Sequence, residues 1–172
     1  MKYKSLFSVI ILCFVSPSIL AQTNCNCCSD EYSKFDFWVG DWNVYDTSGV
    51  LVGENTIVKL EDNCIVNEQW RGKGGVTGRS YNYYNQSDST WNQLWLDNKG
   101  SSLELKGKAE KGKMILKSKL MKGKKVAWYA NRITWIKNKD NSVTQTWEIV
   151  DEHDRVLSVA FVGIYRLKET LK

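Results

Sequence analysis

The stretch Val143-Thr144-Gln145-Thr146-Trp147-Glu148-Ile149-Val150 decides the fold class of this chain. Every second side chain in it, at positions 144, 146 and 148, suits water, so one face of the segment is polar. A polar–apolar period of two is typical of a β-strand with one face turned to the interior. The inward face of this predicted strand carries Val143, Gln145, Trp147 and Ile149.

Working outward from this stretch, nine further runs of β-branched and aromatic residues are separated by short polar turns. No helical period of useful length occurs beyond residue 21. The sequence therefore predicts an all-β domain of about ten strands. The expected strands cover residues 35–45, 50–60, 64–71, 76–84, 91–96, 102–109, 113–121, 126–136, 143–150 and 155–167.

The connections between these predicted strands are of hairpin length throughout. Such a meander closes most economically into a single antiparallel up-and-down β-barrel, which leaves no exposed edge and can hold a small ligand. A flat two-sheet sandwich is the alternative, and the lack of long crossovers favours the barrel.

The first 21 residues have the pattern of a secretory signal peptide. Lys2 and Lys4 precede an apolar run at 6–15 that is too short to span a bilayer, and Ala21 supplies a small residue for cleavage. A membrane anchor is the alternative. We therefore expect an exported protein, periplasmic or extracellular, with a cysteine-containing segment at 22–34 and a barrel domain at 35–172. No second apolar stretch is long enough for a transmembrane span, so we expect the mature domain to be soluble.

Four cysteines lie beyond the predicted leader, at Cys25, Cys27, Cys28 and Cys64. Export to an oxidising compartment favours disulfides. We expect one of the three clustered cysteines to pair with Cys64 and pin the N-terminal segment to the barrel, and of the three we name Cys28. A metal site built from the clustered thiolates is the alternative, although no histidine accompanies them.

The segment Phe35-Asp36-Phe37-Trp38-Val39-Gly40-Asp41-Trp42 resembles the opening of lipocalin-like barrels. In that superfamily a Gly-x-Trp motif starts the first strand, and an arginine near the end of the last strand stacks over the indole. Gly40 and Trp42 match the motif, and Arg166 stands where the arginine would. The resemblance thus implies a cation–π contact that closes the seam between first and last strands.

More closely, the mature chain is similar to an uncharacterised group of secreted bacterial β-barrel proteins of lipocalin-like type. Their Phe-Trp-x-Gly-x-Trp opening is followed by Cys-x-x-x-Glu-x-Trp, Trp-x-Gln-x-Trp and Gln-x-Trp-Glu. Here those stretches are 64–70, 91–95 and 145–148. The resemblance implies a fold and no activity. Only six residues follow Arg166, so we do not expect the long C-terminal helix of typical lipocalins.

One pattern recurs three times, as Glu68-x-Trp70, Gln93-x-Trp95 and Gln145-x-Trp147. In a strand, a spacing of two turns both side chains of a pair to the same face. On the strand at 64–71 we place that face inward. On the strand at 91–96, Leu94 and Leu96 compete for the interior.

If all three pairs face the barrel lumen, flat aromatic walls and a few polar groups line a cavity. Such a mixture suits a small amphipathic or ring-bearing ligand, because indoles supply area and amides fix orientation. The alternative is that these are core tryptophans whose N–H groups bond the neighbouring Gln or Glu. With two residues added by strand parity, the predicted ligand-binding set is Glu68, Trp70, Asn82, Gln93, Trp95, Arg132, Gln145 and Trp147.

Glu68 is the one candidate for acid–base catalysis, because burial beside Trp70 would raise the pKa of its carboxyl group. A structural, hydrogen-bonded glutamate is the plainer interpretation, so no catalytic residue is assigned. His153, the single histidine, lies in an acidic turn where we expect it to be solvated. Without an inward histidine, haem lacks its iron ligand and a serine or cysteine nucleophile lacks its base. The sequence predicts no cofactor and no metal.

Positive charge is concentrated between residues 106 and 125, where nine lysines are opposed only by Glu110. These lysines can approach an anionic envelope surface, or they can simply keep an outer strand face soluble. Nucleic acid is a poor candidate, since no binding motif is present. The nine are Lys106, Lys108, Lys111, Lys113, Lys117, Lys119, Lys122, Lys124 and Lys125.

Three functions follow from these observations. The first is an exported protein that binds a small amphipathic or aromatic ligand inside the barrel. The second is an isomerase or hydrolase built on Glu68, and we favour a protein that is not an enzyme. The third is a structural protein that contacts the cell envelope through its lysine-rich hairpin.

Overall fold

The fold is described from a computed structural model, for residues 25–124 and 126–169. The expected signal peptide at 1–21 lies outside these residues. Neither of the two short helices in the described part, α1 (Asp30–Ser33) and η1 (Asp36–Trp38), is long and apolar enough to cross a membrane.

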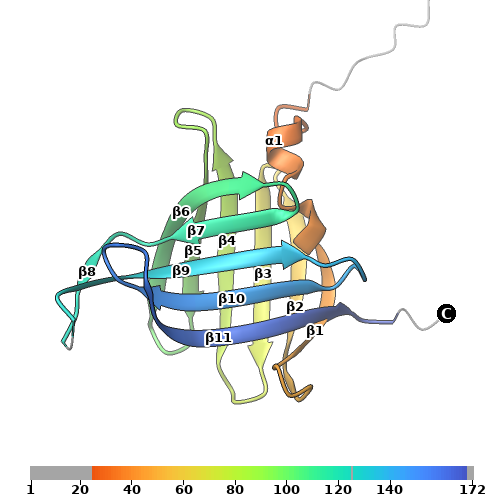
Figure 1. The fold of residues 1–172 in the computed structure, drawn as a ribbon. Coiled ribbons are helices and arrows are strands. Elements are labelled where there is room, and N and C mark those ends of the chain that lie inside the picture. The colour runs from red at the N-terminus through yellow and green to blue at the C-terminus, as the bar shows by residue number, and fades with distance from the viewer. Residues whose placement is uncertain (1–24, 125, 170–172) are drawn as a thin grey trace, which may run out of the picture.

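Ten antiparallel strands close into a barrel, in which each strand pairs with its neighbours in the chain and β11 returns to pair with β1 (Figure 1). The predicted all-β, up-and-down barrel is therefore confirmed. A two-residue strand, β8 (Met121–Lys122), pairs only with β9 outside the ring. The barrel strands are β1 (Gly40–Tyr45), β2 (Leu51–Leu60), β3 (Ile65–Gly72), β4 (Thr77–Asn85), β5 (Thr90–Asp97), β6 (Ser102–Glu110), β7 (Lys113–Lys117), β9 (Trp128–Lys137), β10 (Val143–Val150) and β11 (Val156–Leu167).

The expected first strand is wrong in its first half, because residues 36–38 form the 3-10 helix η1. Phe35 and Trp38 are both completely buried. Residues three apart lie on the same side of a 3-10 helix, whereas in a strand they would point to opposite faces. The helical turn therefore lets both rings enter the core, and the strand begins only at Gly40.

An aromatic plug, made of Phe35, Trp38, Trp91 and Trp135, fills one end of the barrel. The Phe35 ring stacks on Trp38 at 4.9 Å between centroids and meets Trp135 edge-on at 5.2 Å. The indole N–H groups of the three tryptophans are buried without a hydrogen-bond partner among the described residues. Each unpaired donor costs about 1–3 kcal/mol, so the apolar area buried by the four rings must outweigh that cost.

The expected stacking of Arg166 over Trp42 is wrong. Tyr165 points into the barrel and is buried, so the next residue of β11, Arg166, points outward and is exposed. Its guanidinium lies over the ring of Tyr45 on β1, with Cζ 5.4 Å from the ring centroid. The Trp42 indole is buried and donates its N–H to the carbonyl oxygen of Trp38 at 2.8 Å. A cation–π contact thus does bridge β1 and β11, but on the outside of the barrel.

Gly40 has a steric role at the start of β1. Its φ of +147° is a conformation that residues with a side chain rarely adopt. A Cβ atom at this position would lie 2.9 Å from Cδ2 of Leu167 and 3.4 Å from Nε1 of Trp42. The glycine of the Gly-x-Trp motif is therefore required by the close approach of the last strand and of the buried indole.

Two disulfides hold the N-terminal segment, Cys25–Cys28 and Cys27–Cys64. One of the clustered cysteines does pair with Cys64, as expected, but Cys27 takes that place and the predicted partner Cys28 is wrong. Cys27 is almost completely buried against the barrel. Cys28 instead bonds Cys25, three residues earlier, so all four thiols are taken up in disulfides.

The two bridges should contribute very unequally to stability. The Cys27–Cys64 bond joins residues 37 apart, and closing a loop of that length lowers the entropy of the unfolded chain by the equivalent of about 4 kcal/mol. Replacing both of these cysteines by serine should lower the free energy of unfolding by about that amount in chemical denaturation. The matched control, serine at Cys25 and Cys28, should cost less than half as much, and an equal cost would contradict this account.

Candidate functional site

A cavity of about 290 Å³ occupies the part of the barrel that the aromatic plug does not fill. Its lining comes from β3, β5, β6, β9, β10 and β11. Val76 in the β3–β4 turn and Asp97 at the β5–β6 turn both line it, so it lies toward the barrel end that carries these turns. Figure 1 shows these turns at the end of the barrel away from α1.

All three predicted pairs, on β3, β5 and β10, line this one cavity. Glu68 and Trp70, Gln93 and Trp95, and Gln145 and Trp147 all contribute to its wall. The competition on β5 is therefore settled, since Leu96 is 45 % exposed on the outer face. Three strands that are far apart in the sequence thus bring a polar side chain and an indole to the same space.

Two glycines allow the indoles to lie flat against the barrel wall. A Cβ atom at Gly53 of β2 would be 2.3 Å from the ring of Trp70, and one at Gly78 of β4 would be 2.3 Å from the ring of Trp95. Real Cβ atoms do not approach so closely, so any larger residue would push these rings toward the cavity. The backbone of the neighbouring strands therefore sets the position of both aromatic walls.

Glu68 is buried, 5 % exposed, on the cavity side of β3. Its two carboxyl oxygens each accept one hydrogen bond at 2.7 Å, from Nδ2 of Asn55 and from Oγ of Ser80. Burial raises the pKa of Glu68 to about 7, while these two hydrogen bonds work in the opposite direction. The carboxyl group can therefore gain or lose a proton near neutral pH.

The hydrogen bonds around Glu68 continue in two directions along the inner face. On one side Ser80 accepts from Asn82, and Gln93 donates to Asn82 Oδ1 at 2.8 Å. On the other side Asn55 reaches the hydroxyl of Tyr165, which donates to Gln145. Burial, and then the Glu68 carboxyl nearby, raise the pKa of Tyr165 well above its ordinary value, so it remains a neutral donor.

This network contradicts the alternative in which each indole bonds the polar residue two positions before it. Glu68 accepts from Asn55, Gln93 donates to Asn82, and Gln145 accepts from Tyr165. These hydrogen bonds are made with residues of the network and not with the tryptophan of the same pair. The Trp147 indole donates instead to Oδ1 of Asn131 at 2.8 Å. The three polar side chains therefore form a joined polar floor, and the indoles stand beside it.

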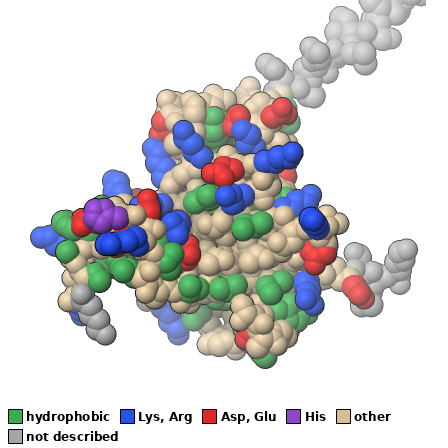
Figure 2. Space-filling model, in the orientation of Figure 1, with side chains coloured by type: hydrophobic (Ala, Val, Ile, Leu, Met, Phe, Trp, Pro, Cys, Tyr) green, Lys and Arg blue, Asp and Glu red, His purple; other side chains and the backbone are tan. Residues whose placement is uncertain are grey.

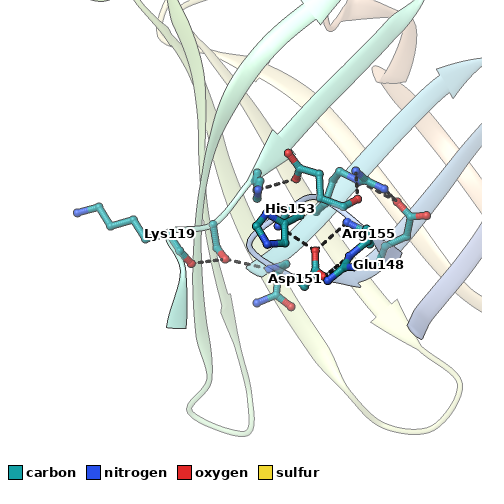
Figure 3. Close-up of polar contacts among 10 residues, drawn as sticks. Lys119, Glu148, Asp151, His153 and Arg155 are labelled. Atoms are coloured by element: carbon teal, nitrogen blue, oxygen red, sulfur yellow. Dashed lines mark hydrogen bonds and ion pairs between the residues drawn. The ribbon is translucent and has the colours of Figure 1, made fainter. Parts of the chain in front are cut away.

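Two residues of the predicted set stand apart from the cavity wall. Asn82 is completely buried on the inner face, below the wall, and supports Gln93 and Ser80. Arg132 is placed wrongly by the parity argument, because Ile133 faces the cavity and Arg132 therefore points outward. Its guanidinium pairs at 2.9 Å with Glu148 on the outer face of β10, one of the residues labelled in Figure 3.

His153 lies in the turn between β10 and β11, with its side chain 67 % exposed. Asp151 organises the turn by accepting from the backbone N–H groups of His153 and Arg155 and from the Arg155 guanidinium (Figure 3). The expectation that this histidine is solvated is confirmed. It belongs to a turn outside the barrel, away from Glu68.

Sequence reasoning missed five residues that shape the site: Asn55, Ser80, Asp97, Phe161 and Tyr165. Strand parity offered a signal for Ser80, which is two residues from Asn82, and for Asp97, which is two from Trp95. On β11, Phe161 and Tyr165 lie four residues apart in a stretch that pairs in regular register with β10, so parity places them on one face. The expected inward position of Arg166 pointed to the opposite face.

A scan of the chain against models of protein families finds no match, and a search among curated proteins finds none either. The geometry of the cavity is therefore the basis on which a function can be assigned.

The pH dependence of stability should report the burial of Glu68. In the folded state its pKa is about 7, above the ordinary value of 4.5, so the folded protein holds more protons than the unfolded chain between these values. Stability should therefore fall as pH rises through this window. Integrated from about pH 5 to about pH 8, the loss is about 2–3 kcal/mol.

The measurement is chemical denaturation of the wild type and of Glu68→Gln at both pH values. The variant should lose that part of the pH dependence. Glu104→Gln, which changes an exposed carboxyl group on β6, should keep it. Parallel pH profiles for the wild type and Glu68→Gln would show that Glu68 titrates as an ordinary exposed acid.

Proposed function

We propose that this barrel is an exported binding protein that holds a small amphipathic, ring-bearing molecule in the cavity lined by Trp70, Trp95 and Trp147. The observation that carries the proposal is the convergence of three indole–polar pairs on one open space of about 290 Å³. This volume lies at the lower end of the range for small-molecule sites.

The physical division within the cavity supports an amphipathic ligand. Indoles and Phe161 provide flat apolar walls, while Glu68, Gln93 and Gln145 form the polar floor. Apolar walls supply binding free energy through buried area, and a few fixed polar groups select the orientation. A ligand with a ring and one polar end matches this arrangement.

Export and family membership are part of the same proposal. Two disulfides are typical of an oxidising compartment, which the pattern of residues 1–21 also predicts. The ordered tryptophan motifs and the closed ten-stranded barrel support placing the chain among the secreted lipocalin-like proteins that it resembles.

Quenching of tryptophan fluorescence by N-phenyl-1-naphthylamine, a neutral aromatic probe, tests the binding function. The probe should quench the wild type with saturation. Trp147→Ala should weaken binding about tenfold or more, because an aromatic wall contributes about 1.5–3 kcal/mol through buried area. Circular dichroism should show that the barrel remains folded.

The matched control is Trp128→Ala, because Trp128 is 39 % exposed at the outer start of β9. This variant should bind the probe as the wild type does. Binding that is equally strong in Trp147→Ala, or the absence of saturable quenching in the wild type, would reject the proposed function.

A second candidate, contact with an anionic envelope surface, is favoured by a lobe beside the cavity end of the barrel. We call residues 118–124, 126–128 and 151–160 the mouth lobe. Figure 2 shows basic and hydrophobic side chains together on this projecting part. Its exposed apolar residues are Leu120, Val126, Trp128, Val156, Leu157 and Val159.

Lys125 lies outside the described residues, and the structure divides the other eight lysines of residues 106–125 by whether they form an ion pair with a described residue. Lys106, Lys113 and Lys117 form ion pairs with Asp88, Glu110 and Asp154 at 2.5–2.9 Å. Lys119 and Lys122, on the mouth lobe, form no ion pair with any residue that the structure describes, and Figure 3 shows Lys119 extended away from the barrel. Lys108, Lys111 and Lys124 likewise form no ion pair with a described residue, but only the lysines of the mouth lobe lie in the region with its exposed apolar side chains.

Sedimentation with vesicles tests this second candidate. The wild type should bind vesicles that contain phosphatidylglycerol and should not bind pure phosphatidylcholine, because the attraction is partly electrostatic. The variant with Lys119→Glu and Lys122→Glu should lose binding by about tenfold or more. The matched control, Lys108→Glu with Lys111→Glu, makes the same charge change outside the lobe and should retain most binding. Equal losses in the two variants would exclude a specific role for the lobe.

A further inference from the structure

We infer that the cavity takes an organic cation, a ligand with an ammonium group joined to a ring or short apolar body, and that Glu68 is its counter-ion. This inference deepens the proposed binding function and rests on it. It names the charge and the chemical class of the ligand, which the three indole–polar pairs alone do not determine.

The charged side chains of the cavity wall are all acidic among the described residues. Among the described residues that line it, two are acids, Glu68 and Asp97, and none is a lysine, arginine or histidine. Asp97 accepts hydrogen bonds from the backbone N–H groups of Ser101 and Lys99, which hold the pKa of its carboxyl group below the ordinary value. The end of the cavity near the turns therefore carries a negative charge at neutral pH.

Uncharged side chains surround Glu68 on the inner face of the barrel. Every neighbouring strand presents a group without positive charge: Asn55 from β2, Ser80 from β4, Gln93 from β5, Gln145 from β10 and Tyr165 from β11. Tyr165 is the only other titratable group in this network, and its raised pKa keeps it neutral. The folded protein thus supplies no counter-ion to this carboxylate within the described residues.

Burial disfavours the ionised carboxylate of Glu68, but its two hydrogen-bond donors favour that form. Asn55 and Ser80 donate one hydrogen bond to each of the two oxygens of Glu68, an arrangement suited to a carboxylate. The buried Oδ1 atom of Asn55 has no hydrogen-bond partner among the described residues. The polar floor around Glu68 therefore holds a carboxyl group and, among the described residues, no positive charge, and a cation with N–H groups in the cavity would supply that charge and donate to the carboxylate.

Aromatic rings line the cavity beside the polar floor. Trp70 and Phe161 meet edge-on at 6.3 Å between ring centroids, and Trp95 and Trp147 complete the lining. The faces of aromatic rings attract cations, and the attraction grows to about 2 kcal/mol when the cation is removed from water. A cavity with aromatic walls and an unpaired carboxyl group provides both interactions that an ammonium group seeks.

Three single-ring probes that differ mainly in charge test this inference: 2-phenylethylammonium, 2-phenylethanol and phenylacetate. Titration calorimetry on the full mature protein should show the ammonium probe binding about tenfold or more tightly than the alcohol. Phenylacetate should bind most weakly, because it would be buried beside Glu68 and Asp97. Glu68→Gln should abolish the preference for the ammonium probe over the alcohol, so that the two affinities in the variant lie within about threefold of each other.

A second measurement needs no variant, in case Glu68→Gln does not fold. The ammonium probe remains charged between about pH 5.5 and about pH 8, whereas Glu68 ionises within that range. Affinity of the wild type for this probe should therefore rise by about tenfold over the range, while affinity for 2-phenylethanol stays level or falls.

The outcomes separate this inference from the function on which it rests. If 2-phenylethanol or phenylacetate binds as tightly as the ammonium probe, or if affinity for the ammonium probe falls as pH rises, the inference is overturned and the binding function stands. If none of the three probes binds and N-phenyl-1-naphthylamine does not quench the wild type, the proposed binding function fails, and the inference fails with it.

Discussion

The burial of Phe35 and Trp38 in one end of the barrel is the constraint on which the rest of the structure depends. These two rings are completely buried there and contact Trp91 and Trp135. Because the aromatic side chains of the N-terminal segment fill one end, those of β3, β5 and β10 can surround space at the other. The disulfide from Cys27 to Cys64 holds the same segment against the start of β3.

Much of the fold was accessible from alternation alone. Thr144, Thr146 and Glu148 identify the outer face of β10, and the same reasoning places Glu68 and Trp70 inside. The errors arise where a contact between distant segments overrides the local pattern. Residues 36–38 are helical because two rings must reach the plug, and Arg166 points outward because the buried Tyr165 precedes it. Neither cause is visible in the residues themselves.

As with the fold, only part of the site could be predicted from the sequence. A spacing of two identifies the three indole–polar pairs, since side chains alternate strictly along a regular strand. The partners of Glu68 were not predictable, because Asn55 and Ser80 come from the two adjacent strands and depend on the register. Arg132 was predicted to face the cavity but does not. A parity count places it inward, yet it pairs with Glu148 on the outer face. Register therefore determines which polar groups meet inside the barrel.

Gly53 and Gly78 influence the shape of the cavity although neither of them lines it. Each lies behind an indole, beneath Trp70 or Trp95, and has no side chain that could meet a guest molecule. A single added methyl group there would thrust the ring inward and narrow the space available. For the proposed binding function, the width of the cavity would thus depend partly on residues that do not line it. A substitution at Gly53 or Gly78 would change the shape of the cavity while all the residues that line it stay the same.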